Sequence, residues 1–190
     1  MKSSLKDKIL FFEIKRKDKE SFVKAYDLYV DDIYRFVYFK VSDKELAEDI
    51  TSAVFLKSWD HILSNNISEF KTLKALFYRV ARNLVIDHYR KKSTSLEKSL
   101  DDDEESDIQD ENFDLEKEVD IKLEHDRILN CMNALKDDYR EILILRFVNQ
   151  LSLDEIAKIL GKSGGSVRIT IHRALKALKE LAEKNNNNNE

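Results

Sequence analysis

The sequence predicts an all-α protein in which two small helical domains are joined by a flexible acidic linker. The first reason is that its 190 residues include 3 glycines and no proline, so residues that form hairpin turns are scarce. The second is that apolar residues recur three and four positions apart, the spacing of amphipathic helices. The third is the charge pattern, because residues 97–120 hold 13 acidic residues against 2 basic ones.

The net charge of -4 conceals three parts of different charge. Residues 1–92 carry +5 and residues 121–190 carry +2, whereas the acidic run between them carries -11. Self-repulsion and a lack of apolar residues are typical of an unfolded tether. We therefore expect a first domain at 1–92, a linker at 93–120, a second domain at 121–184 and a disordered Asn-rich tail at 185–190.

Three helices are expected in the first domain. One has an apolar stripe from Phe22 to Val37, and the next spans 43–63 and ends at a polar loop that begins with Ser64. The third spans 73–91 and has an apolar face for the core. The residues expected on that face are Leu76, Phe77, Val80, Ala81, Leu84 and Val85.

The opposite face of the third helix is basic. Its side chains follow one another at helical spacing and form one stripe, made of Arg79, Arg82, Asn83, Ile86 and Arg90. Residues 71–92 contain seven basic residues and one acid, Asp87. A solvated helix face normally carries both signs of charge, so the imbalance favours a nucleic-acid-binding surface that contacts phosphates and base edges.

The second domain contains a helix-turn-helix pattern. Ser152 and Glu155 have the spacing of a capping box, which predicts a helix that ends at Gly161. Ser163 is the expected N-cap of the following helix. That helix exposes a basic face, since residues 162–179 contain five basic residues and no acid.

The second helix of this motif is expected to enter the major groove of DNA. Arg168 is the candidate for a guanine edge, and Ile169 or Thr170 for thymine methyl groups. Arg173 and Lys176 lie further along and are expected to meet phosphates. The remaining candidates on this surface are Lys162 and Ser166.

Other classes of protein fit the sequence poorly. The single cysteine, Cys131, forms no internal disulfide and belongs to no zinc-finger pattern, so we expect a cytoplasmic protein without a bound metal or cofactor. The apolar run 9–12 is too short to insert into a membrane. The four histidines are isolated from one another and no glycine-rich phosphate loop is present, so an enzyme is the weakest hypothesis.

Two strings together resemble a known family. LFYRVARNLVIDHYRKK at 76–92 is similar to the promoter-melting helices of bacterial sigma factors of the extracytoplasmic-function group. The string from 135 to 178, which includes LSLDEIAKILGKSGGSVRITIHRALKAL, is similar to that family's domain for the minus-thirty-five element. The order of the strings and the acidic linker between them make the joint match specific.

The resemblance implies roles for particular residues. Arg82, Asn83, Asp87 and Arg90 would lie at the minus-ten element, and the loop 64–72 would hold a flipped-out base. Lys162, Ser166, Arg168, Arg173 and their neighbours would hold minus-thirty-five DNA. The helix around Asp49 would contact the clamp coiled coil of core RNA polymerase, and the C-terminal domain would contact its flap tip.

Three departures from the family pattern are visible. Ser52 and Ala53 stand where the family usually has Gln-Glu, so part of the polar contact with the clamp is missing. Leu76 replaces a tryptophan, and Ile169-Thr170 replaces a common Ser-Arg pair, which removes one cation from the recognition helix.

Two functional hypotheses follow. The leading one is a sigma factor that binds core polymerase, recognises both promoter elements and melts the minus-ten element; whether an anti-sigma factor is a further partner stays open. The alternative is a helix-turn-helix repressor or activator that acts without polymerase, although it gives no reason for the basic helix at 73–91.

Overall fold

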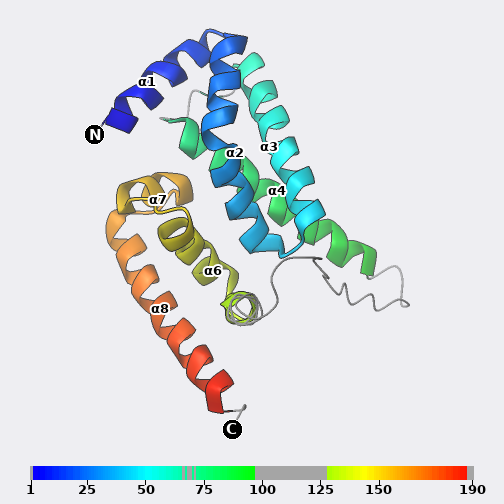
Figure 1. Ribbon diagram of the computed structural model, residues 1–190, viewed down its shortest axis with the longest axis vertical. Helices are drawn as coiled ribbons and strands as arrows, with labels where there is room; N and C mark the ends of the chain where they lie inside the picture. The colour runs from blue at the N-terminus through cyan, green and yellow to red at the C-terminus, as the bar shows by residue number, and fades with distance from the viewer. Residues whose placement is uncertain (1, 66, 68–69, 71, 97–127, 188–190) are drawn as a thin grey trace, which may run out of the picture.

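The computed structural model describes residues 2–65, 67, 70, 72–96 and 128–187. All regular elements in these ranges are helices, which confirms the predicted all-α class (Figure 1). The acidic run at 97–120 lies outside the described residues. Among the described helices, none is both long enough and apolar enough to span a membrane.

The N-terminal domain contains four helices, α1 (Lys2–Lys15), α2 (Lys19–Val41), α3 (Lys44–Leu63) and α4 (Leu73–Leu96). Aspartates begin α2 and α3, because the side chain of Asp18 accepts a hydrogen bond from the Ser21 N–H and that of Asp43 accepts one from the Leu46 N–H. Helices α2, α3 and α4 enclose a core rich in aromatic rings. Its fully buried members include Phe36, Phe77 and Tyr78.

Sequence reasoning did not predict α1. This helix buries Phe11 and Ile14 against the domain and exposes Ile9 and Phe12. Apolar side chains therefore lie on both sides of α1, and its sequence shows no clean amphipathic stripe. The other three helices match their predicted positions, although α4 continues to Leu96 and so enters the range expected to be linker.

The C-terminal domain contains a helical segment at 128–133, α6 (Asp137–Leu143), the π-helix η1 (Ile144–Val148), α7 (Leu153–Leu160) and α8 (Gly164–Asn187). The predicted capping box is present at the start of α7, and Gly161 ends that helix with a left-handed φ of 63°. Helix α8 continues to Asn187, into the Asn run that the sequence places in the tail.

Helix α8 packs through part of its expected apolar face. Val167 and Ala174 are fully buried, whereas Ile171 and Leu178 are half-buried. Helical spacing predicts a buried stripe of Val167, Ile171, Ala174, Leu175 and Leu178, but Leu175 is 42% exposed. Leu175 lies about 100° around the helix axis from Ala174. This position is outside the part of the α8 surface that the shorter helices α6 and α7 cover.

The two domains pack against each other (Figure 1). Helix α4 lies against α7, and α2 lies against η1. The buried apolar residues form one cluster that includes Ile33 and Phe77 from the N-terminal domain and Ile142 and Ile156 from the C-terminal domain. Two separately patterned segments thus share one core.

Candidate nucleic-acid interface

Helix α4 presents the predicted basic stripe on its outer side. The core takes up the opposite side, where Leu76, Phe77 and Ala81 are fully buried. Arg79, Asn83 and Arg90 are exposed, as Ile86 is. The inner face therefore fixes the direction in which these polar groups point.

Neighbouring side chains contact two members of the stripe, Arg79 and Arg90. The Arg79 guanidinium lies 5.6 Å from the centre of the Phe70 ring, within the range of a cation–π contact. Arg90 and Asp87 form a surface ion pair with 3.1 Å between Nη2 and Oδ1. Asp87 thus neutralises part of the positive charge at the C-terminal end of the stripe.

Arg82 differs from the rest of the stripe because the other domain occupies it. Its Nε donates to both carboxylate oxygens of Glu141 on α6, at 2.8 and 3.0 Å. The Glu141 side chain is 5% exposed, so this carboxylate is almost completely withdrawn from water. Sequence reasoning placed Arg82 on a DNA-facing surface and did not foresee this partner.

The loop 64–72, which is expected to hold a flipped base, falls partly outside the described residues. Residues 66, 68, 69 and 71 are not described, whereas Phe70 is half-buried beside Arg79.

The helix-turn-helix places its second helix at the surface. Ser163 caps α8 by accepting a hydrogen bond from the Ser166 N–H at 3.2 Å, as predicted. Ser166, Arg168, Arg173 and Lys176 are exposed. A continuous polar and basic face is therefore open along α8.

Two branched residues stand where the recognition helix departs from its family pattern. Ile169 is 55% exposed and gives this surface an apolar contact point. Thr170 is half-buried, and its hydroxyl donates to the Ser166 carbonyl at 2.8 Å. Because the hydroxyl is bonded to the backbone, the methyl group is the part of the Thr170 side chain that can contact a ligand. The half-buried Lys162 lies 3.7 Å from Asp138.

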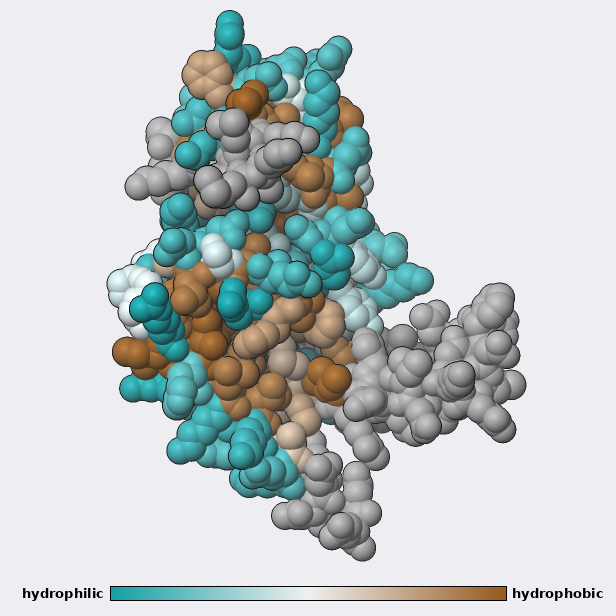
Figure 2. All heavy atoms as spheres, turned by 60° about the vertical axis from the view of Figure 1, so that its left-hand side comes forward, coloured by the Kyte–Doolittle hydropathy of each residue, from teal (hydrophilic) through white to brown (hydrophobic). Residues whose placement is uncertain are grey.

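Figure 2 shows hydrophobic side chains gathered over the lower half of the face it presents, where the C-terminal helices lie, with hydrophilic residues around them. The C-terminal domain also has a hollow between α6 and α8, lined by Leu135, Tyr139, Ala177 and Leu181 among others. The C-terminal domain therefore has an apolar surface in addition to the basic one.

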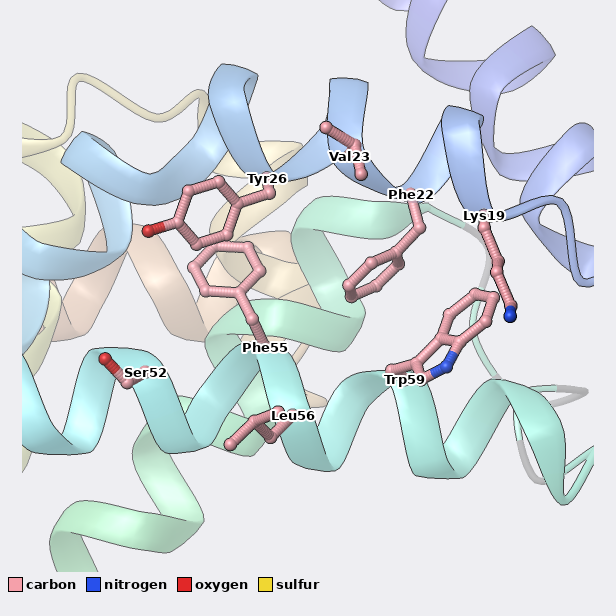
Figure 3. Close-up of a pocket in the computed structure, with 8 residues that line it drawn as sticks. All are labelled: Lys19, Phe22, Val23, Tyr26, Ser52, Phe55, Leu56 and Trp59. Atoms are coloured by element: carbon pink, nitrogen blue, oxygen red, sulfur yellow. The ribbon is translucent and has the colours of Figure 1, made fainter.

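The predicted polymerase-binding residues lie on α3. Asp49 and Ser52 are exposed and Ala53 is half-buried. Ser52 also lines a groove of about 500 Å³ between α2 and α3. Figure 3 shows aromatic side chains from both helices facing one another across this groove, with Phe22 near Trp59 and Tyr26 near Phe55.

Sequence reasoning missed this aromatic groove. The ring centres are 4.8 Å apart in both pairs, and Tyr26 is 42% exposed. The signal was an aromatic pair spaced i, i+4 on each helix, but such spacing also occurs in buried cores. Phe22, at the start of the apolar stripe predicted for α2, and Trp59 are both half-buried.

A second cluster of charged groups joins α1, α2, α4 and α7. Lys74 on α4 donates to Glu155 of the capping box at 2.9 Å. Burial raises the pKa of the Glu155 carboxyl, but hydrogen bonds from the Ser152 backbone, Lys74 and the Ser152 hydroxyl outweigh this effect and hold that pKa below its usual value. Nearby, Tyr29 donates to the buried Asp7, whose pKa is raised by burial.

Comparison with known families covers both domains. The family described as "Sigma-70 region 2" matches residues 25–94, and the family described as "Sigma-70, region 4" matches residues 125–178. The first range contains the stripe of α4 and the second contains the helix-turn-helix.

Two curated proteins illustrate the relationship. The chain is 32% identical over 170 residues to the ECF RNA polymerase sigma factor SigX of Bacillus subtilis (strain 168), covering 87% of this chain and 85% of that protein. It is 30% identical over 164 residues to the ECF RNA polymerase sigma factor BldN of Streptomyces coelicolor (strain ATCC BAA-471 / A3(2) / M145), covering 86% of this chain and 61% of that protein.

Two solved structures share the fold. CnrH, solved in complex with the cytosolic domain of CnrY, matches with a TM-score of 0.69 at 18% identity, covering 94% of this chain and 98% of that one. The sigma factor RpoE of Bartonella quintana, solved with the anti-sigma factor NepR, matches with a TM-score of 0.64 at 22% identity, covering 86% of this chain and 98% of that one. The two regions and the curated relatives agree, and the chain belongs to the extracytoplasmic-function sigma factors, non-enzymatic proteins that direct transcription initiation by RNA polymerase.

Proposed function

We propose that the outer faces of α4 and α8 are the promoter-contacting surfaces of this sigma factor. On α4 the residues that contact and help to melt the minus-ten element are Arg79, Arg82, Asn83, Asp87 and Arg90. On the turn and α8 the residues that contact the minus-thirty-five element are Lys162, Ser166, Arg168, Ile169, Thr170, Arg173 and Lys176.

One observation carries this proposal. Both basic faces lie opposite buried faces, so most of their cations point outward. The exposed ones are Arg79 and Arg90 on α4 and Arg168, Arg173 and Lys176 on α8, whereas Arg82 pairs with Glu141. Such arrays neutralise phosphates and release counterions, which supplies most of the affinity of a protein for DNA. Base-edge contacts from the same faces would add the sequence preference.

Run-off transcription with core RNA polymerase tests the proposal. The double variant Arg82→Ala, Asn83→Ala is expected to reduce open-complex formation more than it reduces binding to core polymerase. Lys8→Ala, which removes one exposed cation from α1, is the control and leaves both unchanged. An equal loss of core binding in the double variant would show that this face of α4 meets the polymerase instead of DNA.

The polymerase itself is proposed to bind at α3. Asp49, Ser52 and Ala53 would face the clamp coiled coil, with the aromatic groove beside Ser52 adding apolar contact, while the C-terminal domain would dock on the flap tip. Asp49→Ala is expected to weaken the association with core polymerase. Glu48→Ala removes an exposed carboxylate about 100° further around the same helix and serves as the matched control.

We further propose a cytoplasmic location and an anti-sigma factor as a regulatory partner. The location follows from the proposed partnership with core polymerase. The regulatory partner is supported by RpoE of Bartonella quintana, a protein of similar fold that was solved with an anti-sigma factor. Affinity purification of the tagged chain from its host is expected to recover polymerase subunits together with such an inhibitor. Recovery of DNA without polymerase would favour the alternative of a conventional helix-turn-helix regulator.

A further inference from the structure

We propose that the aromatic groove between α2 and α3 is a binding site for a small amphiphilic carboxylate, a molecule with an alkyl or aryl body and one anionic end. The groove holds the apolar body, and the Lys19 ammonium pairs with the carboxylate. This binding step does not depend on the promoter contacts proposed above.

The groove has the size and the lining of a small-molecule site. Its volume of about 500 Å³ falls in the range of pockets that hold drug-sized ligands. Its rim is apolar, since Val23 is 58% exposed and Leu56 is 69% exposed. Exposed apolar surface that gathers in one place on a soluble protein commonly marks a binding site.

Packing from below fixes the walls of the groove. The rings of Phe22 and Phe55 both contact the fully buried Phe77 of α4, with ring centres 6.3 and 5.0 Å apart. Each of these two rings also packs against an aromatic ring of the opposite helix, Trp59 or Tyr26. A ligand therefore has to order few side chains when it binds.

The groove suits an apolar body better than an extended peptide. Its lining runs from Lys19 to Tyr26 on α2 and from Ser52 to Trp59 on α3, a length of about 10 Å on each helix. The middle of the groove is made of aromatic and aliphatic side chains. A peptide backbone would leave its N–H and C=O groups unpaired there, whereas an alkyl or aryl body has none to pair.

The two ends of the groove differ in charge. Figure 3 shows the Lys19 ammonium beside Trp59 at one end and the Ser52 hydroxyl at the other. Of the described residues that line the groove, Lys19 is the only charged one. One turn before Ser52 on α3, the exposed carboxylate of Glu48 would repel an anion. The charges therefore favour a ligand with its anionic end at Lys19.

Trp59 reports binding directly, because it is the only tryptophan in the chain. The probe is decanoate, added to the full chain below its micelle concentration. Decanoate should displace water from the half-buried indole and shift its emission to shorter wavelength. The shift should saturate, and equilibrium dialysis should give about one decanoate per chain. An unchanged emission spectrum would overturn the proposal.

Leu56→Glu tests the location of the site. The substitution removes apolar contact at the rim and repels the carboxylate, so the affinity for decanoate should fall about tenfold or more. Leu28→Glu is the matched control, because Leu28 is 56% exposed and lies about 180° around α2 from Lys19. The control should leave the affinity unchanged. Equal affinities in the two variants would place the decanoate outside the groove.

Lys19→Ala tests the charge of the ligand. The affinity for decanoate should fall about threefold to fivefold, the effect of losing one exposed ion pair. The affinity for decanol, a neutral molecule with the same alkyl chain, should not change. Lys24→Ala removes an exposed cation about 140° around α2 and should affect neither molecule. A parallel loss for decanoate and decanol in Lys19→Ala would contradict the pairing with a carboxylate.

A filled groove should also compete with core polymerase. This consequence rests on the proposed contact of α3 with the clamp, because Ser52 belongs to that surface and also lines the groove. When decanoate fills about nine tenths of the grooves, the apparent dissociation constant for core polymerase should rise about tenfold. Leu28→Glu should show the same competition.

The ligand site and the polymerase contact can fail separately. If decanoate shifts the Trp59 emission and core association is unchanged, the ligand site stands and the groove lies outside the polymerase contact. If decanoate does not bind while Leu56→Glu weakens core association, the groove serves the polymerase alone and the ligand site is overturned.

Discussion

Helices α4 and α8 both carry a basic face, yet they offer it to the surroundings in different ways. On α8 the cations Arg168, Arg173 and Lys176 are exposed. On α4 the central arginine, Arg82, is bound by a buried carboxylate from the other domain. Two helices with similar basic patterns in the sequence therefore need not offer the same number of free cations to DNA. An acidic residue far away in the sequence can pair with a cation on one of them.

The largest expected effect concerns the platform beneath the α4 stripe. Phe77 is fully buried, and its ring contacts those of Phe22, Tyr29 and Phe55. Phe77→Ala should lower the free energy of unfolding by about 3–5 kcal/mol, since it leaves a cavity among these rings. Urea unfolding measures the change. Ile86→Ala on the exposed face of the same helix should cost less than about 0.5 kcal/mol.

A second prediction concerns the available face of α8. Arg168→Ala should weaken binding to the preferred minus-thirty-five duplex by about 1–3 kcal/mol and relax the choice of base at one position. Arg173→Ala should weaken binding to all duplexes similarly, because a phosphate contact carries no sequence information. Competition binding across a library of duplexes distinguishes the two variants. Equal loss of selectivity in both would contradict the assigned roles.

A third prediction concerns the turn that aims α8. Gly161 has a φ of 63°, and a Cβ at this position would meet no atom within 4 Å. Gly161→Ala should therefore lower stability by about 1–2 kcal/mol through backbone strain alone. Gly164→Ala is the matched control, because a Cβ there also meets nothing and this residue, the first of α8, has no left-handed φ. Thermal unfolding should show a loss for the first variant and none for the second.

The smallest expected effect is a pH dependence of the contact between α4 and α7. The folded-state pKa of Glu155 is lowered from 4.5, so its contribution to stability is present above pH 4.5 and is lost as the pH falls through the folded value. Lys74 faces this carboxyl, and Asp7 acts in the opposite direction because its pKa is raised. Glu155→Gln should flatten the acid limb of a plot of melting temperature against pH. An unchanged limb would show that Glu155 is not responsible.

Features that depend on neighbouring residues were predicted well. The capping box of Ser152 and Glu155, the left-handed Gly161 and the Ser163 cap all occur as expected. Each rests on groups within four residues of one another, so the chain carries the whole signal locally. The apolar stripes of α2, α3 and α4 also follow from helical periodicity, as does the exposure of Arg79 and Arg90 on α4.

Features that depend on distant residues were not predicted. The contact of Arg82 with Glu141 spans 59 positions of the chain, and neither residue belongs to a pattern that names the other. The exposure of Leu175 depends on how far α6 and α7 extend over α8. The same holds for α1, whose buried apolar residues, Phe11 and Ile14, are identified only by the domain surface that receives them.

Local sequence thus decides where the helices begin, which side of each is apolar and which side is basic, because capping and periodicity act over a few residues. Tertiary packing decides which charged side chains are available. A buried carboxylate must be paired, and only the docking of one domain on the other determines that the partner of Glu141 is Arg82.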